Sequence, residues 1–208
     1  MKVTAFIGSG RKQHTYNASV RFLQNLQSLG NVEYEVVRLS EYNIGTCKGC
    51  RICFDKGEEF CPFRDDRDKL VEKINDSDGV IFASPNYSFQ VSSMMKVFID
   101  RLAFCFHRPC FFGKTFTSIV VQGIGKGQNI VKYLDFVGKG LGFNVVKGCC
   151  IKTLEPMTEK SQADFDRTID QQSKKYFDQL VKSEFPTPSF WWLMVFRMGR
   201  TSMHKMLD

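Results

Sequence analysis

Short apolar runs alternate with stretches of helical periodicity along most of this chain. The run VTAFIG (3–8) is apolar and ends in glycine, which predicts a buried strand. The stretch 18–30 repeats apolar residues at every third position from Val20 to Leu29, which predicts a helix. By the same criteria we expect strands at 3–8, 33–39, 80–85, 116–123 and 143–151, and helices at 18–30, 68–79, 91–104, 129–142 and 161–183.

This alternation of strands and helices favours an α/β fold, in which a doubly wound, five-stranded parallel sheet carries helices on both faces. The loop between the second and third predicted strands, about 40–67, is much longer than the roughly 2–6 residues usual in α/β connections. Long ordered loops of this kind are usually functional, and this one contains four cysteines.

We assign residues 1–184 to one α/β domain and residues 185–208 to a C-terminal arm, which Pro186 and Pro188 separate from it. The arm mixes tryptophan, phenylalanine and methionine with basic residues. This composition favours packing on the body of the protein or on a partner subunit. Contact with a membrane surface is the less favoured alternative.

The composition is that of a soluble globular protein, with 43% hydrophobic and 25% charged residues among 208. No apolar run approaches the roughly 20 residues of a transmembrane helix, and no signal peptide is recognisable, so we expect a cytoplasmic protein. Eight cysteines in such a protein favour metal or redox roles over disulfides. The net charge of +7 fits a solvated basic surface or attraction of anionic ligands, and the scattered basic residues give no indication of nucleic-acid binding.

The loop after the first strand, GSGRKQHTYNAS (8–19), has the chemistry of a phosphate site. Gly8 and Gly10 allow a sharp turn and a close approach of the backbone to an anion, and the following helix directs its positive end there. The loop has neither the GK[ST] ending of a Walker A loop nor the GxGxxG dinucleotide fingerprint. A plain glycine–serine turn is the alternative. The candidate phosphate ligands are Ser9, Arg11, Thr15 and Asn17.

Two further loops follow the third and fourth strands, at the edge of the sheet where ligands bind in such folds. The first begins SPNYSFQ (84–90), in which Asn86 supplies a polar edge and Tyr87 and Phe89 supply flat faces suited to a planar ring. Ordinary core packing is the alternative for both aromatic residues. The second, QGIGKGQN (122–129), has glycines that let main-chain amides approach a ligand.

Together the three loops resemble those of the flavodoxin-like NAD(P)H-dependent FMN reductases. In that family GSxRxxxxT holds the FMN phosphate and SPxYxxxxSxxxKxFIDR holds the flavin; here they read GSGRKQHT and SPNYSFQVSSMMKVFIDR. The resemblance covers about residues 1–180. The first loop departs from the pattern, with Gly10 where proline is common and one residue fewer before Thr15.

The resemblance implies strand order 2-1-3-4-5, a bound FMN, and NAD(P)H as hydride donor. It implies no catalytic side chain, because the flavin N5 accepts the hydride directly. It also implies a homodimer or homotetramer. Carried onto this sequence, Ser9, Arg11, Thr15 and Asn17 would surround the phosphate, Pro85, Asn86, Tyr87, Ser88 and Phe89 would border the isoalloxazine, and Gln122, Gly123 and Gly125 would contact its polar rim.

The cysteines of the long loop have the spacing Cys47-x2-Cys50-x2-Cys53-x7-Cys61. A disulfide is disfavoured in the cytosol, and zinc sites with four cysteines usually show two separate Cys-x2-Cys pairs. The spacing resembles that of the iron–sulfur flavoproteins, a branch of the same superfamily, which implies a [4Fe–4S] cluster. It also resembles FMN reductases whose similar loop folds over the flavin with its cysteines packed as small apolar residues.

Two other features complete the sequence picture. Asp65 and Asp66 are expected to begin the next helix, where acidic side chains suit the dipole. Cys105, Cys110, Cys149 and Cys150 lack ligand spacing and are interpreted as structural.

The leading hypothesis is an FMN-dependent NAD(P)H oxidoreductase that reduces a quinone, a flavin, a nitro or azo compound, or a protein. The first alternative is a carrier of electrons with FMN and [4Fe–4S], serving a redox protein. The second is a zinc-stabilised binding module without flavin.

Overall fold

The structure is a computed structural model that describes residues 1–182, 185, 190–191, 193–194 and 197–199. Most of the predicted C-terminal arm (185–208) lies outside the described residues. Its packing, its contact with a membrane surface and the domain division at residue 184 therefore stay predictions.

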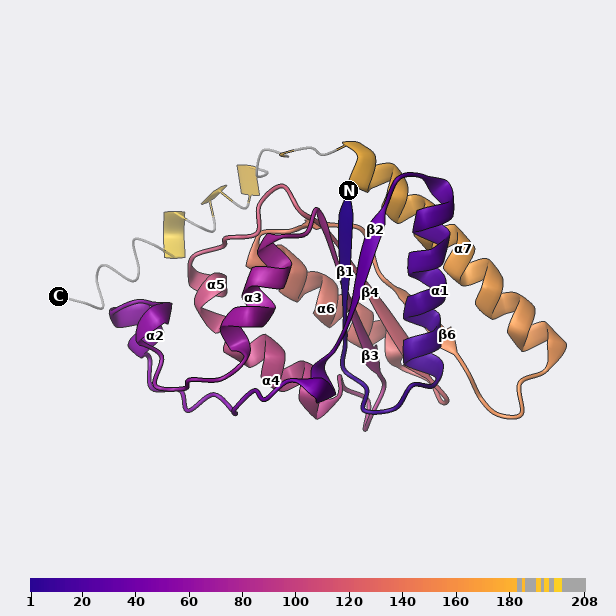
Figure 1. The fold of residues 1–208 in the computed structure, drawn as a ribbon, viewed down its shortest axis with the longest axis horizontal. Coiled ribbons are helices and arrows are strands. Elements are labelled where there is room, and N and C mark those ends of the chain that lie inside the picture. Colours follow the sequence, from indigo (N-terminus) through magenta and orange to yellow (C-terminus); the bar gives the residue numbers. More distant parts are fainter. Residues whose placement is uncertain (183–184, 186–189, 192, 195–196, 200–208) are drawn as a thin grey trace.

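A parallel sheet forms the centre of the molecule (Figure 1). Its strand order is β2-β1-β3-β4-β5, with β6 also paired to β4, and every pairing is parallel. The order predicted from the sequence is confirmed. The strands are β1 (Lys2–Ile7), β2 (Glu33–Arg38), β3 (Gly79–Pro85), β4 (Thr115–Gln122), β5 (Asn144–Val145) and β6 (Cys149–Lys152).

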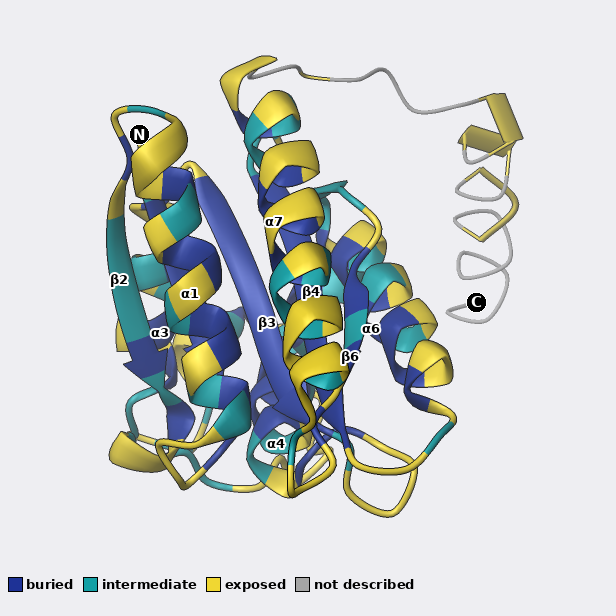
Figure 2. Cartoon of the chain, turned by 90° about the vertical axis from the view of Figure 1, so that its right-hand side faces the viewer, coloured by how far each residue is buried: buried dark blue, intermediate teal, exposed yellow. Residues whose placement is uncertain are grey.

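Helices cover both faces of the sheet (Figures 1 and 2). The helices α1 (His14–Leu29) and α7 (Glu159–Lys182) pack on one face. The opposite face carries α3 (Arg67–Asn75), α4 (Ser93–Arg101), α5 (Ala103–His107) and α6 (Gly127–Leu141). Every residue of β3 and β4 is buried, because these central strands are covered on both sides.

Phenylalanine dominates the core beneath α4 and α6. Phe82 of β3 packs against Phe98 at 5.4 Å between ring centroids and against the edge of Phe116 at 5.0 Å. Phe6 stacks on Phe98 at 5.1 Å. The chain has 20 phenylalanines, and the full burial of these rings shows that part of this number serves core packing.

The long loop after β2 is ordered into short helical turns at Leu39–Glu41 and Glu58–Phe60 and one short helix, α2 (Ile52–Asp55). We call residues 43–66 the cysteine segment. It runs alongside α3 and α5 and ends where α3 begins (Figure 1).

Three predicted helices have different bounds in the structure, and one of them, predicted at 68–79, ends at Asn75. The first helix begins at His14 rather than at residue 18, so Thr15 and Asn17 lie on the helix and not in the loop. The helix predicted at 91–104 begins at Ser93 and is interrupted at Leu102, where α5 takes over. Its start is set by Ser92, whose Oγ accepts a hydrogen bond from the Met95 amide at 3.2 Å.

The fifth predicted strand, 143–151, is interrupted by a bulge. Val145 pairs with Phe116 and Cys149 pairs with Ile119, so three residues of this strand oppose two of β4. The bulge brings Gly148 so close to Ser118 that a Cβ at this position would clash with the serine hydroxyl. The Gly148 amide donates to the Asp135 carboxylate of α6 at 3.1 Å instead of to the sheet.

Candidate functional site

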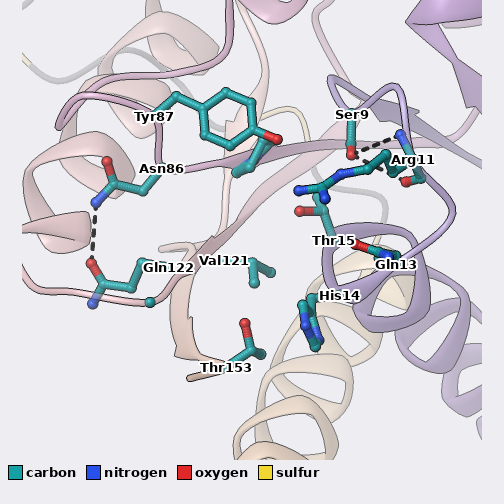
Figure 3. A pocket seen from close by; sticks show the side chains of 12 residues that line it. Ser9, Arg11, Gln13, His14, Thr15, Asn86, Tyr87, Val121, Gln122 and Thr153 are labelled. Carbon is teal, nitrogen blue, oxygen red and sulfur yellow. Dashed lines mark hydrogen bonds between the residues drawn. The ribbon is translucent and has the colours of Figure 1, made fainter. Parts of the chain in front are cut away.

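A cavity of about 170 Å³ lies at the carboxyl ends of the strands, where the loops after β1, β3, β4 and β6 meet (Figure 3). In the order 2-1-3-4-5 the connections from β1 and β3 leave in opposite directions, which creates the crevice in which such sheets bind ligands. The lining residues are Ser9, Arg11, Gln13, His14, Thr15, Pro85, Asn86, Tyr87, Val121, Gln122, Gly123 and Thr153.

The loop after β1 supplies hydroxyl groups and a helix N-terminus to this cavity. Ser9 and Thr15 are buried, and Ser9 Oγ donates to the Arg11 carbonyl at 3.1 Å, which keeps the turn closed. Among the described residues, no side chain caps α1 and no acidic residue lies in its first turn. The free amides and the positive end of α1 therefore suit an anion.

Gly8 is required for the close packing of this loop on α4. A Cβ at this position would come within 2.7 Å of Ser92 Oγ and 2.8 Å of Met95 Cβ. The Gly8 amide donates to the Ala83 carbonyl of β3 at 2.8 Å. Glycine here allows the first loop and the start of α4 to meet at one edge of the sheet.

A hydrogen-bonded network joins the loops after β3 and β4. Gln122 Oε1 accepts from the Gly127 amide at 2.8 Å. It also accepts from Asn86 Nδ2 at 3.3 Å (Figure 3). Asn86 Nδ2 also donates to the Gly125 carbonyl at 3.3 Å. The network fixes both side chains and holds the glycine-rich loop in place at the cavity edge.

The loop after β3 contains a strained two-residue turn. Tyr87 and Gln90 exchange backbone hydrogen bonds of 3.0 and 2.9 Å, and the residues between them, Ser88 and Phe89, have φ values of 49° and 63°. A left-handed backbone conformation is energetically unfavourable for residues other than glycine, and such strain is concentrated at functional sites. The turn projects Tyr87 and Phe89, which are 48% and 56% exposed. Lys126 Nζ lies 5.4 Å from the centre of the Phe89 ring.

The structure brings together most of the residues predicted for the flavin site. Ser9, Arg11, Thr15, Pro85, Asn86, Tyr87, Gln122 and Gly123 line the cavity. Asn17, Ser88, Phe89 and Gly125 are not among the lining residues, and Asn17 is exposed on α1.

Four lining residues were missed by the sequence analysis: Gln13, His14, Val121 and Thr153. Thr153 directly follows β6, so the rule that ligands lie beyond the carboxyl ends of strands could have identified it. His14 is the first residue of α1, and its Nε2 lies 3.3 Å from Glu155 Oε1, which connects the first loop to the segment before α7.

A second cavity lies in the cysteine segment. Cys47, Cys50, Cys53 and Cys61 all line it, together with the aromatic rings of Phe63 and Phe104. Burial raises the pKa of the Cys53 thiol, and the other three cysteines raise it further because they lie near enough to repel its thiolate. In the part of the chain that the structure describes, no three His, Cys, Asp or Glu side chains are grouped closely enough to hold a single metal ion.

Arg101 fixes this cavity to the end of α4. Its guanidinium binds both carboxylate oxygens of Asp65, at 2.5 and 3.2 Å, and donates to the Gly45 carbonyl at 2.9 Å. Its Nη2 also lies 3.6 Å from Cys61 Sγ, and its plane covers the ring of Phe63 at 4.6 Å. The side chains of Arg101 and Asp65 are both almost completely buried.

Asp65 therefore has a role beyond the predicted helix start, at which its carboxylate accepts from the Arg67 amide at 3.2 Å. Burial raises the pKa of Asp65, but the hydrogen bonds from Arg101 and from the amides of Gly45 and Arg67 outweigh it and lower the pKa overall. Asp66 is the residue that precedes α3, and its carboxylate accepts from the Asn43 amide at 2.8 Å. Asp65 and Asp66, at the C-terminal end of the cysteine segment, thus accept hydrogen bonds from the backbone amides of Gly45 and Asn43 near its N-terminal end.

No helix within the described ranges is long and apolar enough to cross a membrane.

Comparison with known proteins gives a consistent set of relatives. Residues 1–152 match the family model of the NADPH-dependent FMN reductases. The chain is 40% identical over 160 residues to an iron-sulfur flavoprotein of Archaeoglobus fulgidus, and the match covers 71% of each chain. It is 29% identical over 192 residues to an iron-sulfur flavoprotein of Clostridioides difficile, covering 89% of this chain and 82% of that one.

Solved structures share the fold at low sequence identity. RosB, determined with bound 8-demethyl-8-formylriboflavin-5'-phosphate, superposes with a TM-score of 0.74 at 14% identity, covering 97% of this chain and 87% of that one. An azoreductase of Bacillus anthracis superposes with a TM-score of 0.65 at 16% identity, covering 85% and 99%. The NAD(P)H:quinone oxidoreductase of Methanothermobacter marburgensis gives 0.65 at 14% identity, covering 84% and 98%. The flavodoxin-like fold expected from the sequence is confirmed.

Proposed function

This chain belongs to the family of NADPH-dependent FMN reductases, and on that premise we propose that it passes electrons from NADH or NADPH through FMN to a quinone, a flavin, a nitro or azo compound, or a protein. The observation that carries the proposal is the cavity in which an uncapped helix N-terminus faces the strained Tyr87 turn. It is a flavin oxidoreductase; the acceptor and the site residues are the parts that we propose.

The residues around the cavity fit FMN. The phosphate would lie at the start of α1, where Ser9, Thr15 and the free amides offer donors and Arg11 adds positive charge. The isoalloxazine would lie between the Tyr87 turn and the Gly123 backbone, with its polar edge near the side chains that Asn86 and Gln122 hold fixed. Asn17 would act on the phosphate only indirectly, because it is exposed and lies off the cavity.

Bound FMN supplies hydride acceptance at its N5, and the side chains position it. The Asn86–Gln122–Gly127 network would hold in place the two side-chain amides that face the edge of a bound ring. The exposed faces of Tyr87 and Phe89 leave one side of the site accessible to a nicotinamide or to an acceptor. We further propose that the protein acts as a homodimer or homotetramer, which light scattering on the purified protein would test.

A second candidate function is electron transfer through FMN and a [4Fe–4S] cluster on Cys47, Cys50, Cys53 and Cys61. It is supported by the four cysteines around one cavity and by the names of the curated relatives. The nine residues of α4 span about 14 Å, from the loop after β3, which lines the first cavity, to Arg101, which lines the cavity in the cysteine segment. The Arg101 donor near Cys61 would raise the reduction potential of the cluster, as hydrogen bonds to cluster sulfurs do.

One preparation tests both candidates. Protein purified without oxygen is analysed for FMN, iron and acid-labile sulfide, and then mixed anaerobically with NADH or NADPH. Bleaching of the flavin absorbance with multiple turnovers of a quinone or azo dye supports the reductase. Iron and sulfide near four per chain, with little turnover by NAD(P)H, supports the carrier. A preparation that holds no FMN, even after incubation with it, contradicts both.

A further inference from the structure

Two cysteines outside the cysteine segment lie in direct contact. Cys105 of α5 and Cys110, just beyond its end, have their Sγ atoms 2.8 Å apart. The S–S bond of a disulfide is about 2.05 Å long, so the sulfurs need to approach by only about 0.8 Å to form one. The Cys110 backbone is held by its amide, which donates to the Leu141 carbonyl at 3.3 Å.

The two thiols have opposite environments. Cys105 is fully buried, whereas Cys110 is exposed. The hydrogen bond between the two sulfurs lowers the pKa of the Cys110 thiol; burial and the negative charge of Glu58 oppose this effect, and the charge of Arg108 adds to it. The same hydrogen bond, together with burial, raises the pKa of Cys105. An exposed thiol of lowered pKa beside a buried thiol of raised pKa is the arrangement of an attacking cysteine and its resolving cysteine.

We propose that Cys105 and Cys110 form a redox-active dithiol that reacts with disulfides of the glutathione class. The Cys110 thiolate attacks one sulfur of the substrate disulfide, which forms a mixed disulfide and releases one thiolate. The Cys105 sulfur then attacks Cys110 Sγ, forms the Cys105–Cys110 disulfide and releases the second thiolate, which takes up the Cys105 proton. Two electrons pass from the dithiol to the substrate, which leaves as two thiols once protonated.

The dithiol is coupled to the cysteine segment through Arg108. This side chain, between the two cysteines in sequence, donates from Nη2 to the Cys53 carbonyl and to Glu58, each at 2.9 Å. Closing the disulfide fixes the chain on both sides of Arg108, so it restrains the contact with the cysteine segment. The inference goes beyond the proposed function and depends neither on FMN nor on an iron–sulfur cluster.

Peptide mapping of the reduced, purified protein tests this site. The protein is incubated with oxidised glutathione, quenched in acid, alkylated and digested with trypsin. Residues 102–114 form one tryptic peptide containing both cysteines, because the Arg108–Pro109 bond resists trypsin. The expected product is this peptide without alkyl groups and lighter by two hydrogen atoms, and it reverts to the dithiol with dithiothreitol. Cys149 and Cys150, in the separate peptide 148–152, are an internal control, since burial raises the pKa of Cys149 to about 12.

Two variants separate the steps. In Cys105→Ser the reaction should stop at glutathione bound to Cys110, and in Cys110→Ser the buried Cys105 should stay unmodified. Wild-type folded protein that retains two alkylatable thiols in 102–114, or that accumulates glutathione on Cys110 without closing the disulfide, overturns the proposal. The wild-type result decides alone if a variant fails to fold.

Discussion

Replacing Arg101 by methionine removes the side chain that attaches the cysteine segment to α4. Arg101 makes two hydrogen bonds to Asp65, one to the Gly45 carbonyl and one to Cys61 Sγ. Methionine fills most of the same volume but supplies no donor. The variant therefore leaves the Asp65 carboxylate and the Gly45 carbonyl without their cationic partner in a buried site.

The expected cost follows from these contacts. Breaking a buried ion pair by removing one partner typically costs about 3–5 kcal/mol. Asp65 keeps two backbone donors, the amides of Gly45 at 2.8 Å and Arg67 at 3.2 Å, so the lower end of this range applies. A loss of about 3 kcal/mol corresponds to a decrease in Tm of about 6–12 °C for a protein of this size. Asp65→Asn should cost a similar amount, because it leaves the guanidinium buried without a counter-charge.

A double-mutant cycle by urea denaturation, at fixed FMN concentration, tests this reasoning. We expect the double variant to lose about 3–4 kcal/mol rather than the sum of the single losses, because the two side chains lose the same interaction. The matched control is Arg167→Met, which removes an exposed ion pair with Asp164 and should cost less than about 1 kcal/mol. Single losses no larger than that of the control, or strictly additive losses, would refute the buried-pair account.

Three further predictions follow from the same structure. Thr15→Val removes a buried hydroxyl at the start of α1 and should weaken FMN binding about tenfold or more, as measured by fluorescence titration. The control Asn17→Ala, at a residue that does not line the cavity, should change the affinity less than about threefold. Equal effects of the two substitutions would contradict the assigned phosphate position. Because the pKa of Asp65 is lowered in the folded protein, its ionised carboxylate stabilises the fold fully at pH values above its ordinary pKa of about 3.9. This stabilisation is lost as the pH falls through the lowered pKa. In that acidic range the urea midpoint of Asp65→Asn should therefore depend less on pH than the urea midpoint of the wild type. Phe82→Ala should cost about 3–5 kcal/mol in the same assay, since its ring is fully buried against Phe98 and Phe116, and a loss below about 1 kcal/mol would contradict the packing.

The sheet, and most of the residues that line the cavity at its carboxyl edge, could be predicted from the sequence because their signals are local. The strands are short apolar runs, and the strand order came with the resemblance of the loop motifs. The start of α1 could not be predicted by periodicity, because its first residues, His14 to Asn17, are mainly polar and show no apolar repeat. Thr153 was missed because the loop after the last strand carries no motif of its own.

Side-chain contacts that no local pattern signals account for the other features that the sequence analysis did not predict. Asp65 lies at the start of α3 as expected, but it also binds Arg101, 36 residues away, and no local pattern signals that pairing. The bulge in the last strand depends on Ser118 and Asp135 of other elements. Cys105 and Cys110 carry no metal-ligand spacing, and only the turn beyond α5 brings their sulfurs together.

The most direct test of the proposed flavin site is a comparison of FMN with riboflavin, which has the same ring system but no phosphate. If the phosphate lies at the N-terminus of α1, its loss removes several charge-assisted hydrogen bonds of about 1.5–3 kcal/mol each, and riboflavin should bind at least about 100-fold more weakly. Measured by quenching of flavin fluorescence, this difference should shrink in Thr15→Val. Equal affinities for FMN and riboflavin, or a difference that Thr15→Val leaves unchanged, would contradict the assignment of this cavity.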